Sequence, residues 1–169
     1  MSQRELADYI QAFNIEHFLE DFKNDFDKRL ELQKAIYLLQ ESGGDLGYHF
    51  SWYLRGPYSP SLADDAYSLF FTGKERFRIT RGGISRIDPR VKDTFANILA
   101  EASKRSRNGK DESRWLEILS SVHYLMKHGY PHPTTKEEGI QYMLNLKGDR
   151  FSRHEVEEAY QILRKVGLL

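Results

Sequence analysis

Apolar side chains recur at helical spacing along most of the chain. The clearest case lies between Arg29 and Gln40, where they follow one another three and four positions apart at Leu32, Ala35, Ile36 and Leu39. Leu30, Tyr37 and Leu38 add apolar surface on other sides of the same segment. A helix that is apolar most of the way round is buried on most sides, so this segment is predicted to be the central helix of the core.

Further helices are expected on both sides of the central one. Apolar spacing and capping residues place them at residues 2–13, 60–71, 89–102, 115–127, 135–146 and 152–166. Ser152 and Glu155 have the spacing of a capping box, and Asp88 precedes Pro89 as an N-cap precedes the first helical residue. Most of the chain is therefore predicted to be helical.

Two short segments alternate between apolar and other residues, as strands do. From Tyr48 to Arg55 one face is predicted to be buried, with Tyr48, Phe50, Trp52 and Leu54 on it, and Gly56-Pro57 ends the strand. Phe77–Asp88 is predicted to be a β-hairpin around Arg81-Gly82-Gly83. The order helix, strand, helix, hairpin is that of a winged helix-turn-helix in outline.

These elements predict an α+β fold that is mainly α. We expect a helical domain with a winged-helix-like core, made of one strand plus the hairpin, and a C-terminal helical unit. Residues 1–103 form the expected core, residues 104–112 a basic linker without apolar side chains, and residues 113–169 a three-helix unit packed on the same domain. A chain of 169 residues is about the size of one domain.

Composition narrows the class of protein. The chain has no cysteine, which excludes disulfides, thiolate metal sites and cysteine nucleophiles. Because no apolar run approaches the length of a membrane span and no apolar stretch follows Met1, a cytoplasmic protein without a membrane partner is expected. The net charge of +0 argues against a surface that attracts nucleic acid everywhere.

No catalytic or metal-binding motif is found. His128 and His132 are four residues apart, but Gly129 and Pro131 interrupt the helix that would align them. The chain has no phosphate-binding glycine loop and no nucleophile elbow, and nothing singles out a pair of carboxylates for acid–base chemistry. The prediction from sequence is a protein that is not an enzyme, with no metal and no cofactor.

The charge is nevertheless unevenly distributed. Residues 51–110 carry 12 basic and 6 acidic side chains, whereas residues 1–50 carry 5 and 10. The predicted hairpin region is the most basic part, and its candidate nucleic-acid contacts are Lys74, Arg76, Arg78, Arg81 and Arg86. Against DNA reading, Asp64 and Asp65 lie on the exposed face of the helix that would enter the groove. The acidic N-terminal segment of the same chain is an alternative partner for the basic strip.

Two segments resemble a known family. They are Leu32–Gln40, with the pattern L-Q-K-x-x-Y-L-x-Q, and Phe50–Pro60, an aromatic strand that ends in a Gly-Pro turn. Over roughly residues 26–75 the chain is similar to the Panacea domain, the SocA-type antitoxin domain, and especially to its YwgA-like bacterial branch. The resemblance implies a bacterial, archaeal or phage source. Antitoxin members of that family neutralise a partner protein directly or deliver it to a protease, and others have no assigned activity.

The preferred hypothesis is therefore a protein-binding module, an antitoxin or an adaptor, that acts on a toxin-like or other target protein. Its candidate partner-binding residues, where the central helix meets the end of the strand, are Lys34, Tyr37, Arg55, Tyr58, Asp64 and Asp65. The alternative for these residues is structural, with Trp52 in the core and Arg55 paired with Asp64 or Asp65. The alternative function is a nucleic-acid-binding regulator of the winged-helix type. The oligomeric state and the partner's identity stay open.

Overall fold

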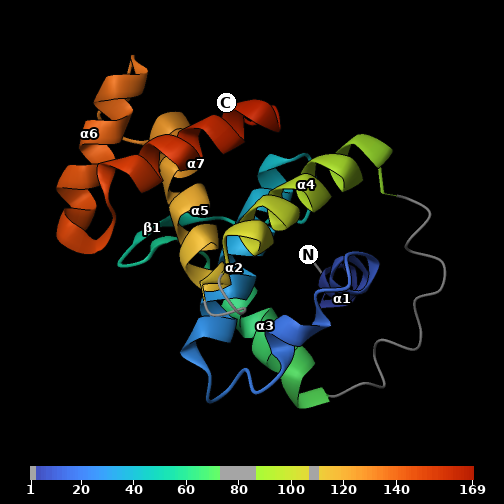
Figure 1. Cartoon of the computed structure of the whole chain (residues 1–169). Helices are drawn as coiled ribbons and strands as arrows, with labels where there is room; N and C mark the ends of the chain where they lie inside the picture. The colour runs from blue at the N-terminus through green and yellow to red at the C-terminus, as the bar shows by residue number, and fades with distance from the viewer. Residues whose placement is uncertain (1–2, 73–86, 107–110) are drawn as a thin grey trace.

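The structure, a computed structural model, describes residues 3–72, 87–106 and 111–169 (Figure 1). These residues form seven α-helices, two 3-10 turns and one two-stranded antiparallel sheet, so the predicted class, mainly α with a small sheet, is confirmed. The elements are α1 (Gln3–Ala12), η1 (Glu16–Leu19), α2 (Phe26–Glu41), β1 (Ser51–Tyr53), β2 (Gly56–Tyr58), α3 (Pro60–Thr72), α4 (Pro89–Arg105), α5 (Glu112–His128), α6 (Lys136–Lys147), η4 (Gly148–Arg150) and α7 (Arg153–Lys165).

Helix α2 is the centre of the molecule, as its apolar pattern predicted. Every residue from Leu30 to Leu39 is buried, because α2 packs against α3, α4, α5, η1 and β2. The helix begins after Asp25, whose side chain accepts hydrogen bonds from the backbone N–H groups of Asp27 and Lys28. It ends before Gly43, which has a φ of +107° that favours glycine.

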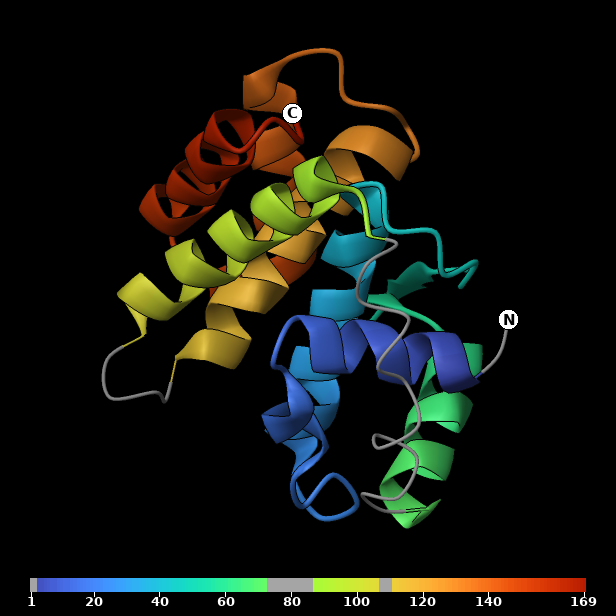
Figure 2. The ribbon, with the colours of Figure 1, turned by 90° about the vertical axis from the view of Figure 1, so that its right-hand side faces the viewer.

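Helices α3, α4 and α5 pack directly on α2, and other helices pack on them. Helices α4, α5 and α7 pack together on one side, and α1 and α3 pack together on the other (Figure 2). Helix α5 also contacts α6 and β2, so the C-terminal helices are joined to α2 and the sheet through α5. Among the helices of the described ranges, none is both long and apolar enough to cross a membrane.

The segment predicted as a linker, residues 104–112, is partly helical. Helix α4 continues through Arg105, and α5 already begins at Glu112. The helix extends because Arg105 donates to the carboxylates of Glu101, one turn earlier, and Glu158 on α7. These ion pairs hold the end of α4 against the C-terminal helices.

The sheet differs from the prediction. The segment expected as one strand is a hairpin, in which Ser51 pairs with Tyr58, Trp52 with Pro57 and Tyr53 with Gly56. The chain turns at Leu54 and Arg55, so Leu54 is 82% exposed instead of buried. The turn comes there because Gly56 takes a φ of +94°, a backbone conformation that residues with a side chain rarely adopt.

Local signals for helix starts are confirmed where they are described. Asp88 caps α4 through the backbone N–H of Arg90, and Ser152 and Glu155 form both halves of the capping box of α7. The predicted hairpin at Phe77–Asp88 lies almost wholly outside the described residues, since the description resumes at residue 87. The winged-helix comparison depends on that hairpin; the sheet seen here belongs to residues 51–58.

Candidate functional site

Two glutamines of α2 hold the chain on either side of the hairpin. Gln33 accepts from the backbone N–H of Ser59 and donates to its carbonyl, both at 2.9 Å. Gln40 makes the same pair of hydrogen bonds with the backbone of Tyr48, at 2.8 and 2.9 Å. Seven residues are two helical turns, so both amides lie on one side of α2 and replace the strand that would otherwise satisfy these backbone groups.

Lys34 reaches the same region from the buried side of α2. Its side chain is 1% exposed, and its Nζ donates to the carbonyl of Pro57 at 2.6 Å. Burial lowers the pKa of Lys34 to about 7, and the charge of Glu117 opposes that shift. Close approach is possible because Gly56 has no side chain: a Cβ there would collide with the hydroxyl of Ser121 on α5.

A fully buried carboxylate lies behind the hairpin. Glu117 on α5 is 0% exposed and accepts from Lys147 at 3.1 Å and from Arg150 at 2.6 Å. Burial raises the pKa of Glu117, and the Lys147 ammonium, Arg55 and Lys34 oppose that shift. Lys147 also lies 5.0 Å from the ring centre of Trp52, so this cluster joins the hairpin to the end of α6.

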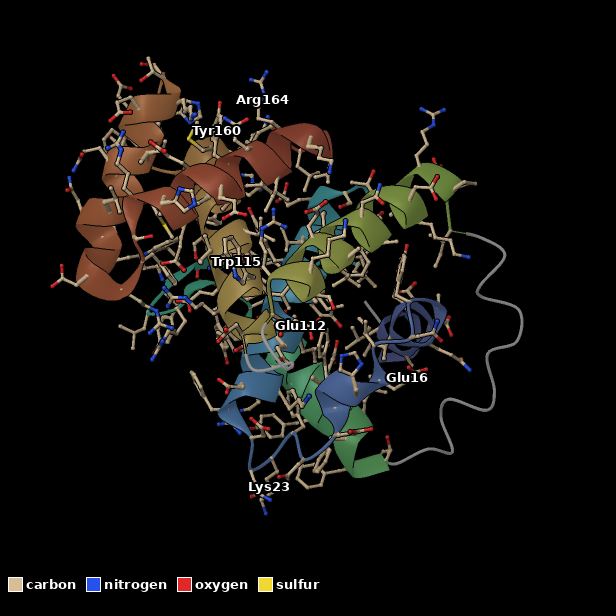
Figure 3. The ribbon with its side chains drawn as sticks, viewed as in Figure 1. Glu16, Lys23, Glu112, Trp115, Tyr160 and Arg164 are labelled. Carbon is tan, nitrogen blue, oxygen red and sulfur yellow. The ribbon has the colours of Figure 1, made fainter. Side chains whose placement is uncertain are left out.

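A cavity of about 490 Å³ opens where the start of α2, the hairpin and α3 meet. Its walls combine aromatic rings with basic groups: Phe22, Phe26, Tyr53, Tyr58 and Tyr67 among the rings, and Arg29, Lys34 and Arg55 among the cations. Figure 3 labels Lys23, which follows Phe22 in the chain, at one end of the molecule. The volume is within the range of small-ligand sites.

Large apolar side chains stand exposed at the mouth of the cavity. Phe26 is 50% exposed, Tyr53 is 60% exposed and Leu54 is 82% exposed, and all three line it. The guanidinium groups of Arg29 and Arg55 each lie 5.8 Å from the centre of the Phe26 ring. We call Phe26, Tyr53, Leu54 and Arg55 the rim. Exposed apolar and aromatic groups beside arginine are typical of protein interfaces.

The structure brings together half of the partner-binding residues expected from sequence. Lys34, Arg55 and Tyr58 all line the cavity. Asp64 is exposed on α3; it is the second cause, after burial, of the raised pKa of Tyr58. Asp65 accepts a hydrogen bond from the hydroxyl of Tyr48 at 2.7 Å.

Tyr37 lies elsewhere, inside the core. It is 1% exposed, and its hydroxyl is hydrogen-bonded to Nδ1 of His123 at 2.8 Å. The ion pair considered for Arg55, with Asp64 or Asp65, does not form among the described residues. Of the candidate nucleic-acid contacts, all five (Lys74, Arg76, Arg78, Arg81 and Arg86) lie outside the described residues.

Sequence reasoning missed the residues that shape the mouth of the cavity. Phe22 and Phe26 are four residues apart, as on one face of a helix, but spacing alone does not show that Phe26 is half exposed. Tyr53 and Leu54 were assigned to the faces of one continuous strand. The signal that could have placed them at a turn was Gly56 two residues later.

Comparison with known proteins finds a similarity to a protein that is named as an enzyme. A DNA ADP-ribosyl glycohydrolase from Thermus aquaticus is 32% identical to this chain over 111 residues, which cover 59% of this chain. The matched part is 31% of that protein, so the chain spans less than a third of the relative's length. No family model matches the sequence, and no solved structure matches it.

This relationship corrects one prediction from the sequence. The absence of catalytic motifs led us to expect a protein that is not an enzyme, and that prediction is contradicted because the relative is named as a glycohydrolase. The reason for the error is general. A search for known motifs detects only the constellations that have a recognisable spacing in sequence, whereas active sites are defined by geometry.

Proposed function

We propose that the chain is a protein-binding module, antitoxin-like or adaptor-like, that holds a partner protein at the rim and the cavity behind it. The observation that carries the proposal is the exposure of Phe26, Tyr53 and Leu54 around a cavity that also contains arginine. Aromatic residues and arginine anchored in a pocket contribute most of the binding energy in protein interfaces. The resemblance to Panacea-type and YwgA-like proteins supports the same reading.

The scaffold suits such a role because it fixes the rim firmly. Gln33 and Gln40 hold the chain before and after the hairpin, and Lys34 holds Pro57 next to the turn. A surface that is held rigid before binding loses less conformational entropy when the partner arrives. The exposed rim is thus presented on a preorganised support.

Affinity capture tests the proposal. The tagged chain is used to capture partners from its native host with and without nuclease, in parallel with Leu54→Asp and Tyr130→Asp. Tyr130 is 92% exposed but does not line the cavity, so its variant is a matched control. We expect the wild type to capture a protein in stoichiometric amount, with or without nuclease. Leu54→Asp should lose this protein and Tyr130→Asp should retain it. The captured protein should bind the chain again when both are purified.

Two results would contradict the proposal. Equal capture of the protein by the wild type and by Leu54→Asp would show that the rim is not part of the interface. Recovery of nucleic acid, or of proteins that nuclease releases, would favour the regulator that uses the basic segment, and such binding should weaken steeply as salt is raised.

The relative's name gives a second candidate function, the removal of ADP-ribose from DNA. The test is to incubate the chain with an ADP-ribosylated oligonucleotide and measure free ADP-ribose by chromatography. Lys34→Met and Arg55→Gln, which alter the two basic groups nearest Gly56 in the cavity, are compared with Arg164→Gln. Turnover that is lost only in the cavity variants would support this function, and no turnover by the wild type would refute it.

A further inference from the structure

Three basic side chains line one cavity without forming an ion pair with any of the described residues. Arg29 donates to the backbone carbonyls of Phe22 at 3.0 Å and Lys23 at 2.8 Å, and Lys34 donates to that of Pro57. For Arg55, the described residues provide neither a hydrogen bond nor an ion pair, and its guanidinium lies over the ring of Phe26.

Several other basic groups of the described chain meet a glutamate. Arg114 pairs with Glu155 at 2.8 Å, and Lys165 pairs with Glu101 at 3.1 Å. Arg29, Lys34 and Arg55 differ from these paired groups, because they lie together along one cavity whose walls are largely aromatic and apolar, where charge interactions are stronger than in bulk water. This is the arrangement expected of a site whose acidic partner comes from another molecule.

The buried carboxylate of Glu117 does not supply that charge. Glu117 already accepts from Lys147 and from both nitrogen groups of Arg150 that reach it. Lys34 and Arg55 act on it only as additional nearby positive charges. The region behind the hairpin therefore carries more positive than negative charge, and an anion in the cavity would reduce the excess.

The walls specify the rest of the ligand. Phe26 and Tyr58 offer ring faces and edges on which an aromatic group can pack, and Tyr67 and Phe22 pack edge to face behind them, with ring centres 5.0 Å apart. Arg55 is the cavity's one guanidinium with all its donors unused by described residues, which suits one carboxylate bound through two parallel hydrogen bonds.

We propose that the cavity binds an acidic aromatic segment of the partner protein, meaning a Phe or Tyr next to an Asp or Glu. The carboxylate pairs with Arg55 close to Lys34, and the ring packs against Phe26 and Tyr58. This inference rests on the proposed function, since the exposed rim beside the cavity is the surface that would meet the partner. A protein ligand is favoured over a small molecule because Tyr53 and Leu54 extend the apolar surface beyond the cavity.

The test uses small probes, so that it does not depend on knowing the partner. The 15N-labelled full chain is titrated with 3-phenylpropionate, with its neutral amide 3-phenylpropanamide, and with phenyl phosphate. We expect the carboxylate to shift the amide resonances of Phe26, Arg55 and Gly56. Its affinity should exceed that of the neutral amide by about tenfold or more, as a charge-assisted hydrogen bond provides.

Variants show whether Arg55 causes the preference. Arg55→Gln should reduce the ratio of the two affinities to about one, whereas Arg164→Gln should leave it unchanged. Arg164 is a suitable control because it is exposed on α7 and forms no ion pair with the described residues; Figure 3 shows it at the opposite end of the molecule from Lys23.

Three outcomes would overturn the inference. Equal affinity for the carboxylate and the amide would show that charge is not recognised, and tighter binding of phenyl phosphate would point to a phosphorylated ligand instead. The absence of shifts with every probe would show that the cavity is not a ligand site. If Arg55→Gln still captures the partner while Leu54→Asp does not, the proposed function stands and this inference fails.

Discussion

At the scale of single residues, Gly56 decides how the hairpin meets the core. Its φ of +94° is costly for any residue with a side chain, and a Cβ would strike the hydroxyl of Ser121. Ser121 Oγ is itself buried and has no hydrogen-bond partner among the described residues. The close contact between β2 and α5 therefore leaves no room for a side chain at position 56.

Gly56→Ala is expected to destabilise the chain considerably more than a Gly→Ala change at a glycine that has a similar φ but no neighbouring atoms around its added Cβ. Gly167 provides this control, because its φ is +87° and nothing lies within 4 Å of its added Cβ. We expect Gly167→Ala to lower the free energy of unfolding by about 1 kcal/mol and Gly56→Ala by about 2–4 kcal/mol, measured by urea denaturation. Equal losses would show that the collision with Ser121 relaxes at no cost.

Lys34 gives a second prediction at this scale. Its pKa is lowered to about 7 in the folded chain, whereas an exposed lysine has 10.5, so between these values the unfolded chain binds more protons. The contribution of Lys34 to the free energy of unfolding must then rise with pH above 7, by up to about 1.4 kcal/mol per pH unit. The test is to measure the free energy of unfolding of the wild type and of Lys34→Met from pH 7 to 9. The difference between the two proteins at each pH gives the contribution of Lys34.

The pH range is limited because other groups change at higher pH. Burial raises the pKa of Tyr37 and of Tyr48, so stability that depends on their neutral hydroxyls is lost above about pH 10. A difference between the wild type and Lys34→Met that stays constant from pH 7 to 9 would show that Lys34 remains protonated in the fold.

At the scale of elements, α2 is a platform that orders two non-helical segments. Gln33 and Gln40 satisfy backbone groups of Ser59 and Tyr48 that no strand reaches. Removing such an amide leaves a buried N–H and a buried carbonyl without partners, which is costlier than losing the hydrogen bonds alone. The polar residues within this apolar helix are thus structural.

Gln33→Leu is expected to cost about 2–4 kcal/mol of unfolding free energy, and to remove the hydrogen-exchange protection of the Ser59 amide. Gln141→Leu is the matched control, because Gln141 is exposed on α6 and, within the part of the chain that the structure describes, its side chain donates a hydrogen bond only to that of Asn145. We expect its effect to stay within about 0.5 kcal/mol. Retained protection at Ser59 in Gln33→Leu would refute the role of the glutamine.

The helices could be predicted from sequence because each one carries its own signals. Apolar spacing marks α2, and capping residues mark α4 and α7. The turn at Leu54 and Arg55 was missed because alternation of apolar residues is compatible with one strand or with the first half of a hairpin, and Gly56 was the local signal against a continuous strand. The cavity could not be predicted from sequence either, because Phe26 and Arg55 are distant in sequence and only the packed fold brings them together.

At the scale of the whole molecule, Glu117 joins the C-terminal helices to the hairpin. It is the common acceptor for Lys147, at the end of α6, and Arg150 in η4. Lys147 in turn reaches the Trp52 ring and the backbone of Leu54. The charge cluster therefore couples the position of the rim to the packing of α5 and α6.

Glu117→Ala is expected to destabilise the chain by about 3–5 kcal/mol, because it leaves the buried side chain of Lys147 and the partly buried side chain of Arg150 without a counter-charge. The control is Glu137→Ala, which breaks an exposed pair with Arg153 and should cost much less, because water screens exposed ion pairs. Both are measured by urea denaturation at the same pH. Similar losses of unfolding free energy in the two variants would show that the buried cluster stabilises the fold no more than an exposed ion pair does.

The most direct test of the central claim is the affinity of the purified partner for four forms of the chain: the wild type, Arg55→Gln, Leu54→Asp and Tyr130→Asp. If the rim and its cavity hold the partner, Leu54→Asp and Arg55→Gln should each weaken binding by about 30-fold or more, as residues at the centre of an interface do. Tyr130→Asp should change the affinity by less than about threefold. Four equal affinities would contradict the account, because the partner would then bind elsewhere.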